Sequence, residues 1–134
     1  MSLNKSTVLQ TFNSTFFDFI NDIISIFPDN SDIVTAKNFF EMTKKANPTI
    51  IIKIWFIYIY KPYSSVIEQG DISFFYDKNY EGDLANLVNS KEILKTIDTL
   101  RDPIRSMSET NKSHSMKYIQ LLSNLSEVYN KLTA

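Results

Sequence analysis

Asp77, Asn79, Glu81 and Gly82 have the types and spacing of the first half of a calcium-binding loop. In such a loop, oxygen ligands occupy alternate positions and a glycine at position six allows a sharp turn. The twelfth position, which should supply a bidentate glutamate, is Val88. We therefore expect an acidic turn here and no bound metal, because the loop lacks its strongest ligand.

His114 is the sole histidine of the chain, which contains no cysteine. Without cysteine the chain cannot be a disulfide scaffold, a zinc finger or a cysteine enzyme. No serine–histidine–aspartate triad can be assembled around His114, which lies in a polar stretch, so we expect it to face solvent. No glycine-rich phosphate-binding motif occurs either. The sequence therefore predicts a non-enzymatic protein without a cofactor.

Six basic residues in the last third of the chain are the candidates for a nucleic-acid contact: Lys91, Lys95, Arg101, Arg105, Lys112 and Lys117. Acidic residues alternate with them along the sequence, as on a solvated helix face: Glu92, Asp98, Asp102 and Glu109. The formal net charge of the chain is −1, whereas neutralising many phosphates needs an excess of cations. We expect nucleic-acid binding to be weak, and a nucleic-acid-associated factor is the alternative function.

Helical periodicity predicts an all-α fold. Apolar residues recur at spacings of three and four over Leu9–Phe27, with Ser6 or Thr7 as the N-cap and Pro28 as the stop. A polar turn then caps a second helix over 33–45. The chain has only two glycines, so it can form few tight hairpins, which also favours helices over sheets.

The segment Thr49–Tyr60 is apolar at nearly every position. Its β-branched and aromatic residues are typical of a strand, but the preceding Asn47 and Pro48 are a helix start and no partner strand is evident. We interpret the segment as a helix that is buried at the centre of the fold or shared with a partner. It is shorter than the roughly 20 residues that span a bilayer.

The remaining elements complete one domain over residues 1–134. Pro62 opens a short helix that Gly70 ends, and Pro103 should kink or break a later helix. The apolar seam of that later helix comprises Ile93, Ile97, Leu100, Ile104 and Met107, and the last helix has the stripe Met116, Ile119, Leu122, Leu125, Tyr129 and Leu132. The sequence thus predicts a single-domain bundle of six or seven helices around an apolar central helix.

Some apolar side chains make the apolar faces of their segments wider than packing into one core requires. We predict that these side chains form a homodimer interface. They lie on the first helix, in the apolar central segment and in an aromatic run: Phe17, Ile24, Ile26, Trp55, Tyr58, Phe74 and Phe75. A monomer with a tightly wrapped central helix is the alternative.

Short sequence features along nearly the whole chain resemble one family. They are Phe12-Asn13-Ser14, Phe19-Ile20, Ile26-Phe27-Pro28-Asp29, Ala36-Lys37, Asn47-Pro48, Ile54-Trp55, Gly70-Asp71-Ile72, Phe74-Phe75, Leu100-Arg101-Asp102-Pro103-Ile104-Arg105 and Lys117-Tyr118-Ile119-Gln120. Together they are similar to a small family of uncharacterised proteins of nucleocytoplasmic large DNA (giant) viruses. The resemblance implies a viral origin and no catalytic residues.

The resemblance shapes the expected function. We expect a viral protein that acts through self-association or binding to another viral or host protein, with a factor of viral transcription or genome packaging as the alternative. The N-terminal residues do not resemble a secretory signal. We therefore expect the protein inside the infected cell, in the cytoplasm or the viral factory and in some cases the virion, without a membrane contact.

Overall fold

The computed structural model describes residues 4–73, 96 and 98–133, and within them the fold is all-α, without a strand. Its elements are the helices α1 (Lys5–Ile26), α2 (Ser31–Ala46), α3 (Ile50–Ile54), α4 (Lys61–Gln69), α7 (Arg101–Arg105) and α8 (Glu109–Thr133), and the π-helix η1 (Trp55–Tyr60). The predicted all-α class is confirmed. The calcium-like loop and Phe74, Phe75, Lys91, Lys95, Ile93 and Ile97 lie outside the described residues.

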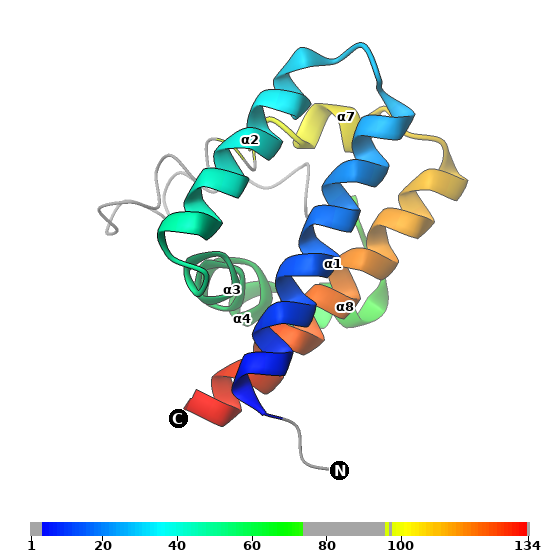
Figure 1. Ribbon diagram of the computed structural model, residues 1–134. Helices are drawn as coiled ribbons and strands as arrows, with labels where there is room; N and C mark the ends of the chain where they lie inside the picture. Colours follow the sequence, from blue (N-terminus) through cyan, green and yellow to red (C-terminus); the bar gives the residue numbers. More distant parts are fainter. Residues whose placement is uncertain (1–3, 74–95, 97, 134) are drawn as a thin grey trace.

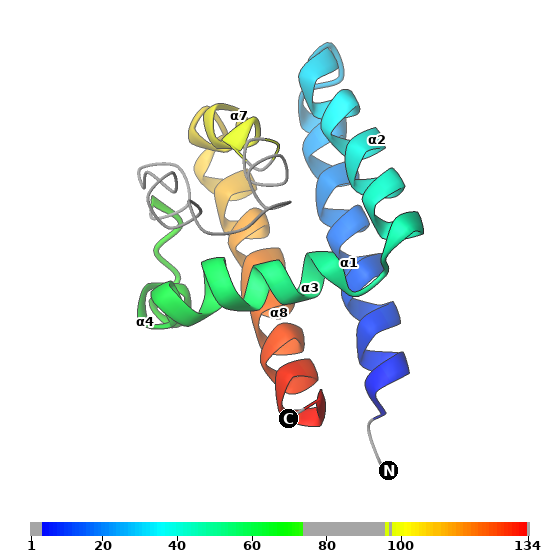
Figure 2. The same ribbon diagram turned by 90° about the vertical axis from the view of Figure 1, so that its left-hand side faces the viewer.

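Two long antiparallel helices, α1 and α8, lie side by side and form the frame of the fold (Figure 1). Helix α2 folds back against α1. The helical run from α3 through η1 to α4 crosses α1 and α8 on one side, as Figure 2 shows. The short α7 lies near the first turns of α8. The frame therefore has one side covered by the crossing run and another side formed by α1 and α8 alone.

Side-chain caps and prolines set the helix ends. Asn4 caps α1 by accepting a hydrogen bond from Thr7 N at 2.8 Å, so the expected cap at Ser6 or Thr7 is wrong and the helix starts earlier. An asparagine is as good an N-cap as a serine, and here it lies two residues before Ser6 and three before Thr7. Asn30 caps α2 from the polar turn as predicted, through a bond of 3.0 Å from Asp32 N.

The ambiguous apolar segment is helical, and it is longer than expected. Residues Ile50–Gln69 form one helical run whose central six residues are a π-helix. Pro62 cannot donate a backbone hydrogen bond, and in an α-helix its ring would collide with the carbonyl of Tyr58. The wider π turn ends just before this proline, and Tyr63 after it leaves helical geometry at φ −123° and ψ 20°.

The helical run is longer than the apolar segment that the sequence indicated as too short to span a bilayer. Among the described residues, Ile50–Gln69 is the helix that is long and apolar enough to cross a bilayer, so shortness alone no longer argues against a span. Length and composition are weak evidence, because core helices of soluble proteins also meet these criteria. In this fold the run packs one face on α1 and α8 and leaves Lys53 and Ile57 exposed.

Aromatic rings fill the core between α1, α2 and η1. The ring of Phe16 lies edge-on to Phe40 of α2, with centroids 4.9 Å apart, and to Trp55 of η1 at 6.2 Å. Phe12 contacts the same indole at 6.1 Å. Trp55 is only 2% exposed, so its prediction as part of a self-association surface is wrong. A helix that is apolar nearly all round does not reveal which of its faces is inside.

Prolines and glycines act as predicted at two further positions. Thr99 and Leu100 form a turn, and α7 starts at Arg101, so Pro103 lies in its first turn, where no backbone donor is needed. Gly70 ends α4 in the left-handed region at φ 77° and ψ 22°. A Cβ at Gly70 would meet Gln120 Nε2 at 3.8 Å, which is an ordinary contact.

Replacing Gly70 therefore tests backbone strain without a steric clash. We expect Gly70→Ala to lower the free energy of unfolding by about 1 kcal/mol, because alanine pays for a positive φ. Gly70→Asn, the matched control, should cost less because asparagine tolerates this region. Urea unfolding measures both, and equal costs would contradict the strain explanation.

Candidate interaction surfaces

His114 and the carboxylates do not form a candidate catalytic or metal centre in the described part of the chain. His114 is exposed on α8, as expected from its polar neighbours. Among the described residues, no three histidine or acidic side chains are grouped so as to hold a metal ion. The structure thus directs attention to surfaces that could bind another macromolecule.

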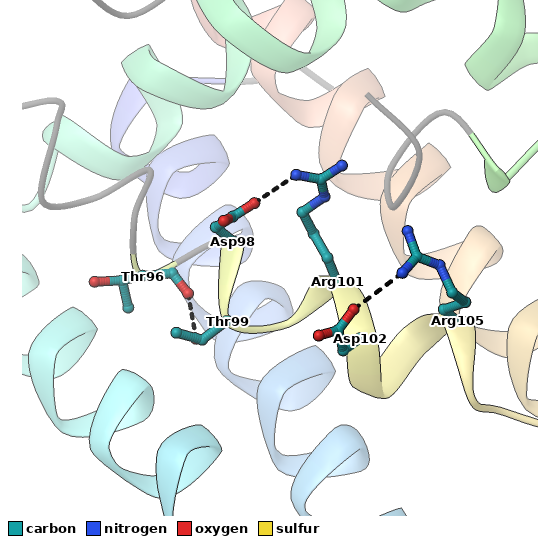
Figure 3. A network of polar contacts seen from close by, with 6 residues as sticks. All are labelled: Thr96, Asp98, Thr99, Arg101, Asp102 and Arg105. Atoms are coloured by element: carbon teal, nitrogen blue, oxygen red, sulfur yellow. Dashed lines mark hydrogen bonds and ion pairs between the residues drawn. The ribbon is translucent and has the colours of Figure 1, made fainter. Parts of the chain in front are cut away.

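The predicted nucleic-acid contact is a row of local ion pairs where the structure describes it. Arg101 Nη1 lies 2.7 Å from Asp98 Oδ1, and Arg105 Nη1 lies 3.1 Å from Asp102 Oδ1 (Figure 3). Helix α7 thus presents its two arginines together with the acidic neighbours identified in the sequence. Each positive charge is largely offset within one helical turn.

The other two described members of that set lie on α8. Lys112 Nζ is 3.9 Å from Glu109 Oε1 in the first turn of the helix. Lys117 is exposed, and no ion pair with another described residue is found for it. The basic candidates therefore do not form one continuous positive patch over the described residues.

One flank of α8 is fixed to the crossing run by polar contacts. The indole Nε1 of Trp55 donates to Ser123 Oγ at 3.0 Å, and both groups are buried. Gln120 Nε2 donates to the carbonyl of Ile67 at 2.9 Å. The Tyr60 hydroxyl donates to Glu127 Oε2 at 2.6 Å. This flank is therefore occupied along much of its length.

The Tyr60–Glu127 contact is charge-assisted. Its hydrogen bond to the carboxylate, together with burial, raises the pKa of Tyr60 to about 12. The same hydrogen bond, with a second one from Lys131, lowers the pKa of Glu127. Lys131 Nζ lies 3.0 Å from Glu127 Oε1. Both shifts favour the protonated tyrosine beside the ionised carboxylate, which is the pair seen in the fold.

Four of the residues predicted to form a self-association surface are half-buried. Lys44 of α2 covers the ring of Phe17, with Nζ 5.3 Å from the centroid. Ile24 and Tyr58 pack against the core, and Ile26 does the same near the end of α1. These four side chains therefore leave less apolar surface uncovered than the sequence predicts.

A different apolar row lies on the other flank of α8, away from Gln120 and Glu127. We call it the α8 seam, and its members recur at spacings of three and four: Tyr118, Leu121, Leu125, Val128 and Leu132. Leu121 is 47% exposed and Leu132 is 42% exposed, while the other three are half-buried. Tyr118, Leu125 and Val128 pack against the core, whereas Leu121 and Leu132 leave apolar surface uncovered on the same flank.

The sequence contained a signal for the α8 seam that the predicted stripe missed. The stripe is confirmed for Met116, Ile119, Leu122 and Tyr129, which are buried, and Leu125 packs against the core, whereas Leu132 is 42% exposed. Ser115, Ser123 and Ser126 are fully buried because their small side chains let neighbouring helices approach. The heptad spacing of the seam was present in the sequence, but only the structure separates it from the core face.

Opposite charges border the α8 seam on its two sides. Tyr118 stacks on Phe19 of α1, with ring centroids 5.3 Å apart, so α1 adjoins the seam there. Asp18 and Asp22 of α1 are close enough to raise the pKa of Tyr118, although burial is the larger cause. Lys117 lies on the side of the seam that faces away from α1. The upper part of the seam thus has an acidic border and a basic border.

A small groove lies where the crossing run meets the end of α8. It has a volume of about 210 Å³ and is lined by Ile52, Lys53, Phe56, Ile57, Ser126, Tyr129, Asn130 and Thr133. Ile57 is 48% exposed at its edge. The groove is large enough for one apolar side chain of a partner. The α8 seam instead presents a row of five apolar side chains.

The Tyr60–Glu127 pair predicts a pH-dependent stability. We expect Tyr60→Phe to lower the free energy of unfolding by about 1 kcal/mol at pH 7. Because the folded pKa of Glu127 is lowered, the stability from its ionised form is present above its unfolded pKa and is lost as pH falls through the folded value. The cost of Tyr60→Phe should therefore shrink in acid.

Ionisation of Tyr60 should reduce the cost of Tyr60→Phe in alkali as well. The raised pKa of Tyr60 stabilises the fold below pH 10, and this contribution is lost as pH rises to about 12. Tyr58→Phe is the matched control, because Tyr58 is a half-buried tyrosine of the same helix. Urea unfolding across pH measures both variants. A cost for Tyr60→Phe that does not change with pH would contradict the charge-assisted bond.

Two surfaces therefore distinguish this molecule, the α8 seam with its charged borders and the smaller groove. The chain matches no protein-family model, no curated protein and no solved structure.

Proposed function

We propose that this chain is a non-enzymatic protein that acts through self-association as a two-fold dimer, with the α8 seam as its interface. The exposure of Leu121 and Leu132 on one row with three half-buried apolar residues carries the proposal. Contiguous exposed apolar rows are typical of interaction sites, and closed two-fold dimers are the commonest homo-oligomers. The heptad spacing is the one with which helices pack along their length.

The magnitude of this burial indicates a dimer of modest affinity. Removing the exposed half of one leucine from water contributes about 1 kcal/mol. Leu121 and Leu132 in two copies would thus contribute about 4 kcal/mol, whereas micromolar affinity requires about 8 kcal/mol. Tyr118, Leu125, Val128 and the charged borders would have to contribute the rest. We therefore expect dissociation to occur within the micromolar range.

The proposal extends to the setting and to the rest of the fold. A single domain over residues 1–134, with six or seven helices around the segment Ile50–Tyr60, would present the α8 seam on a rigid frame. The family resemblance supports a viral protein inside the infected cell, in the cytoplasm, viral factory or virion. Another viral or host protein that occupies the same seam is the second kind of partner.

Light scattering after size exclusion tests the dimer. At concentrations from about 10 to 200 µM, we expect the mass to rise from near 15.5 kDa towards twice that value. Leu121→Glu should hold the mass at the monomer value at all concentrations, because the charge would have to be buried in the interface. Met42→Glu on α2 is the matched control, because Met42 is 72% exposed and lies away from the seam.

Circular dichroism of each variant separates a lost interface from a lost fold. A folded Leu121→Glu monomer beside a dimeric Met42→Glu protein supports the α8 seam. A wild-type protein that stays monomeric at 200 µM overturns self-association. If instead Ile57→Glu alone abolishes the dimer, the interface is the groove and not the seam.

The alternative role in transcription or packaging makes a separate prediction. Since Arg101 and Arg105 are paired with neighbouring aspartates, the predicted contact has little net positive charge with which to release counterions from nucleic acid. We expect a mobility-shift assay near 0.15 M salt to detect weak binding at best to duplex or single strands. Submicromolar binding under these conditions would favour the alternative over the interaction protein.

A further inference from the structure

We infer that the occupant of the α8 seam is a second copy of this chain whose α8 runs parallel to the first, with Lys117 of each copy facing the other copy's acidic border. This inference rests on the proposed self-association and adds the orientation and the polar contacts that select the partner. It is drawn from the placement of charges on the two borders of the seam.

The charges at issue have no counter-ion among the residues that the structure describes. Asp18 is exposed and Asp22 is half-buried, and neither forms an ion pair with a described residue. The same holds for Lys117 across residues 4–73 and 98–133. Lys131, further down the same border, is different because Glu127 already binds it. The unsatisfied charges are thus gathered at the Tyr118 end of the seam.

These charges also lie at the same level along the axes of α1 and α8. Tyr118 stacks on Phe19, and Asp18 and Asp22 lie one residue before and three residues after Phe19 on α1. Lys117 immediately precedes Tyr118 on α8. A cross-section of the molecule at Tyr118 therefore meets the acidic border on one side of the seam and the basic border on the other.

A two-fold axis that relates two facing surfaces must lie in the plane between them, and its direction decides which borders meet. An axis that runs along α8 leaves the position of every residue along that direction unchanged. It brings the acidic border of one copy opposite the basic border of the other. Lys117 then faces the partner's Asp18 and the partner's Asp22, and the contact occurs twice. The two α8 helices run parallel in this arrangement.

The other axis gives the opposite contact. An axis across α8 makes the helices antiparallel and places each border opposite the like border of the other copy. With its centre near Asn124, it would bring Lys117 opposite the partner's Lys131. Because Glu127 already binds Lys131, this arrangement gives Lys117 no counter-ion. The charges thus favour the parallel dimer. The leucines could be buried in either arrangement and do not distinguish the two.

Charge reversal with complementation tests the orientation. We expect Lys117→Glu to weaken the dimer at least about tenfold, because the new carboxylate would face two aspartates. The double variant Asp18→Lys/Asp22→Lys should weaken it similarly. A one-to-one mixture of the two variants should recover dimerisation, because both contacts of the mixed dimer then join opposite charges. Lys61→Glu on α4, an exposed lysine of the crossing run, is the control and should not change the dissociation constant.

Single cysteines give a second readout, since the chain has none of its own. In the parallel dimer, Leu121→Cys and Leu132→Cys should each form a disulfide with the same residue of the other copy, because their Cα atoms approach across the axis. In an antiparallel dimer centred midway between the two positions, near Ser126 and Glu127, the two positions would cross-link only when the two variants are mixed. The two positions are about 16 Å apart along the helix, so the patterns do not overlap.

The outcomes separate the inference from the proposed function. A wild-type monomer at all concentrations overturns both. A wild-type dimer that Lys117→Glu leaves equally tight or tightens, with cross-links only in the cysteine mixture, overturns the parallel arrangement and leaves self-association intact. Weakening by each charge reversal, recovery in their mixture and disulfides within each cysteine variant support the inference.

Discussion

The position of the Trp55 indole determines how the helical layers fit together. Its ring lies edge-on to Phe16 and near Phe12 of α1, and its Nε1 donates to Ser123 of α8. One side chain therefore holds α1, η1 and α8 at a common point. An indole buried without a partner for its N–H would be costly, so the small hydroxyl of Ser123 is as much a part of this junction as the aromatic rings.

This junction has a direct effect on the surface of the molecule. Because the buried face of α8 has serines at Ser115, Ser123 and Ser126, it packs closely on its neighbours. Met116, Ile119, Leu122 and Tyr129 share this buried face, and a second set of apolar residues lies on the flanks of α8. Polar contacts with the crossing run occupy one flank, through Gln120 and Glu127, and the seam remains on the other. The exposed leucines are thus a consequence of how the core is packed.

Much of the fold could be predicted from local residue chemistry. Asn30, Gly70 and Pro103 mark helix boundaries through backbone effects that depend little on the rest of the chain. The helical state of Ile50–Tyr60 also followed, since its start signals outweigh its β-branched residues. The side of that helix that would be buried could not be predicted, because an apolar residue at nearly every position leaves no periodic contrast.

The place of the proposed interface differs from the one that the sequence predicts. Phe17 and Ile24 looked like surplus apolar surface, yet the chain itself half-buries them, Phe17 beneath Lys44 of α2. The α8 seam escaped notice because Leu125 and Leu132 fitted a core stripe equally well in the sequence. Spacing identifies apolar rows on a helix, whereas the choice between inner and outer rows depends on contacts distant in the sequence.

The π-helix has a consequence for how this sequence can vary. A π turn is equivalent to an α-helix that has accepted one extra residue. Deleting a single residue within Trp55–Tyr60 would therefore restore α geometry and leave the residues after it at nearly the same angle around the helix axis. The same deletion in α3 would rotate those residues by about 100°, because no bulge is there to absorb it. Ile67 would then point away from Gln120. The π turn is thus the place within this helical run where the chain length can change at the least structural cost.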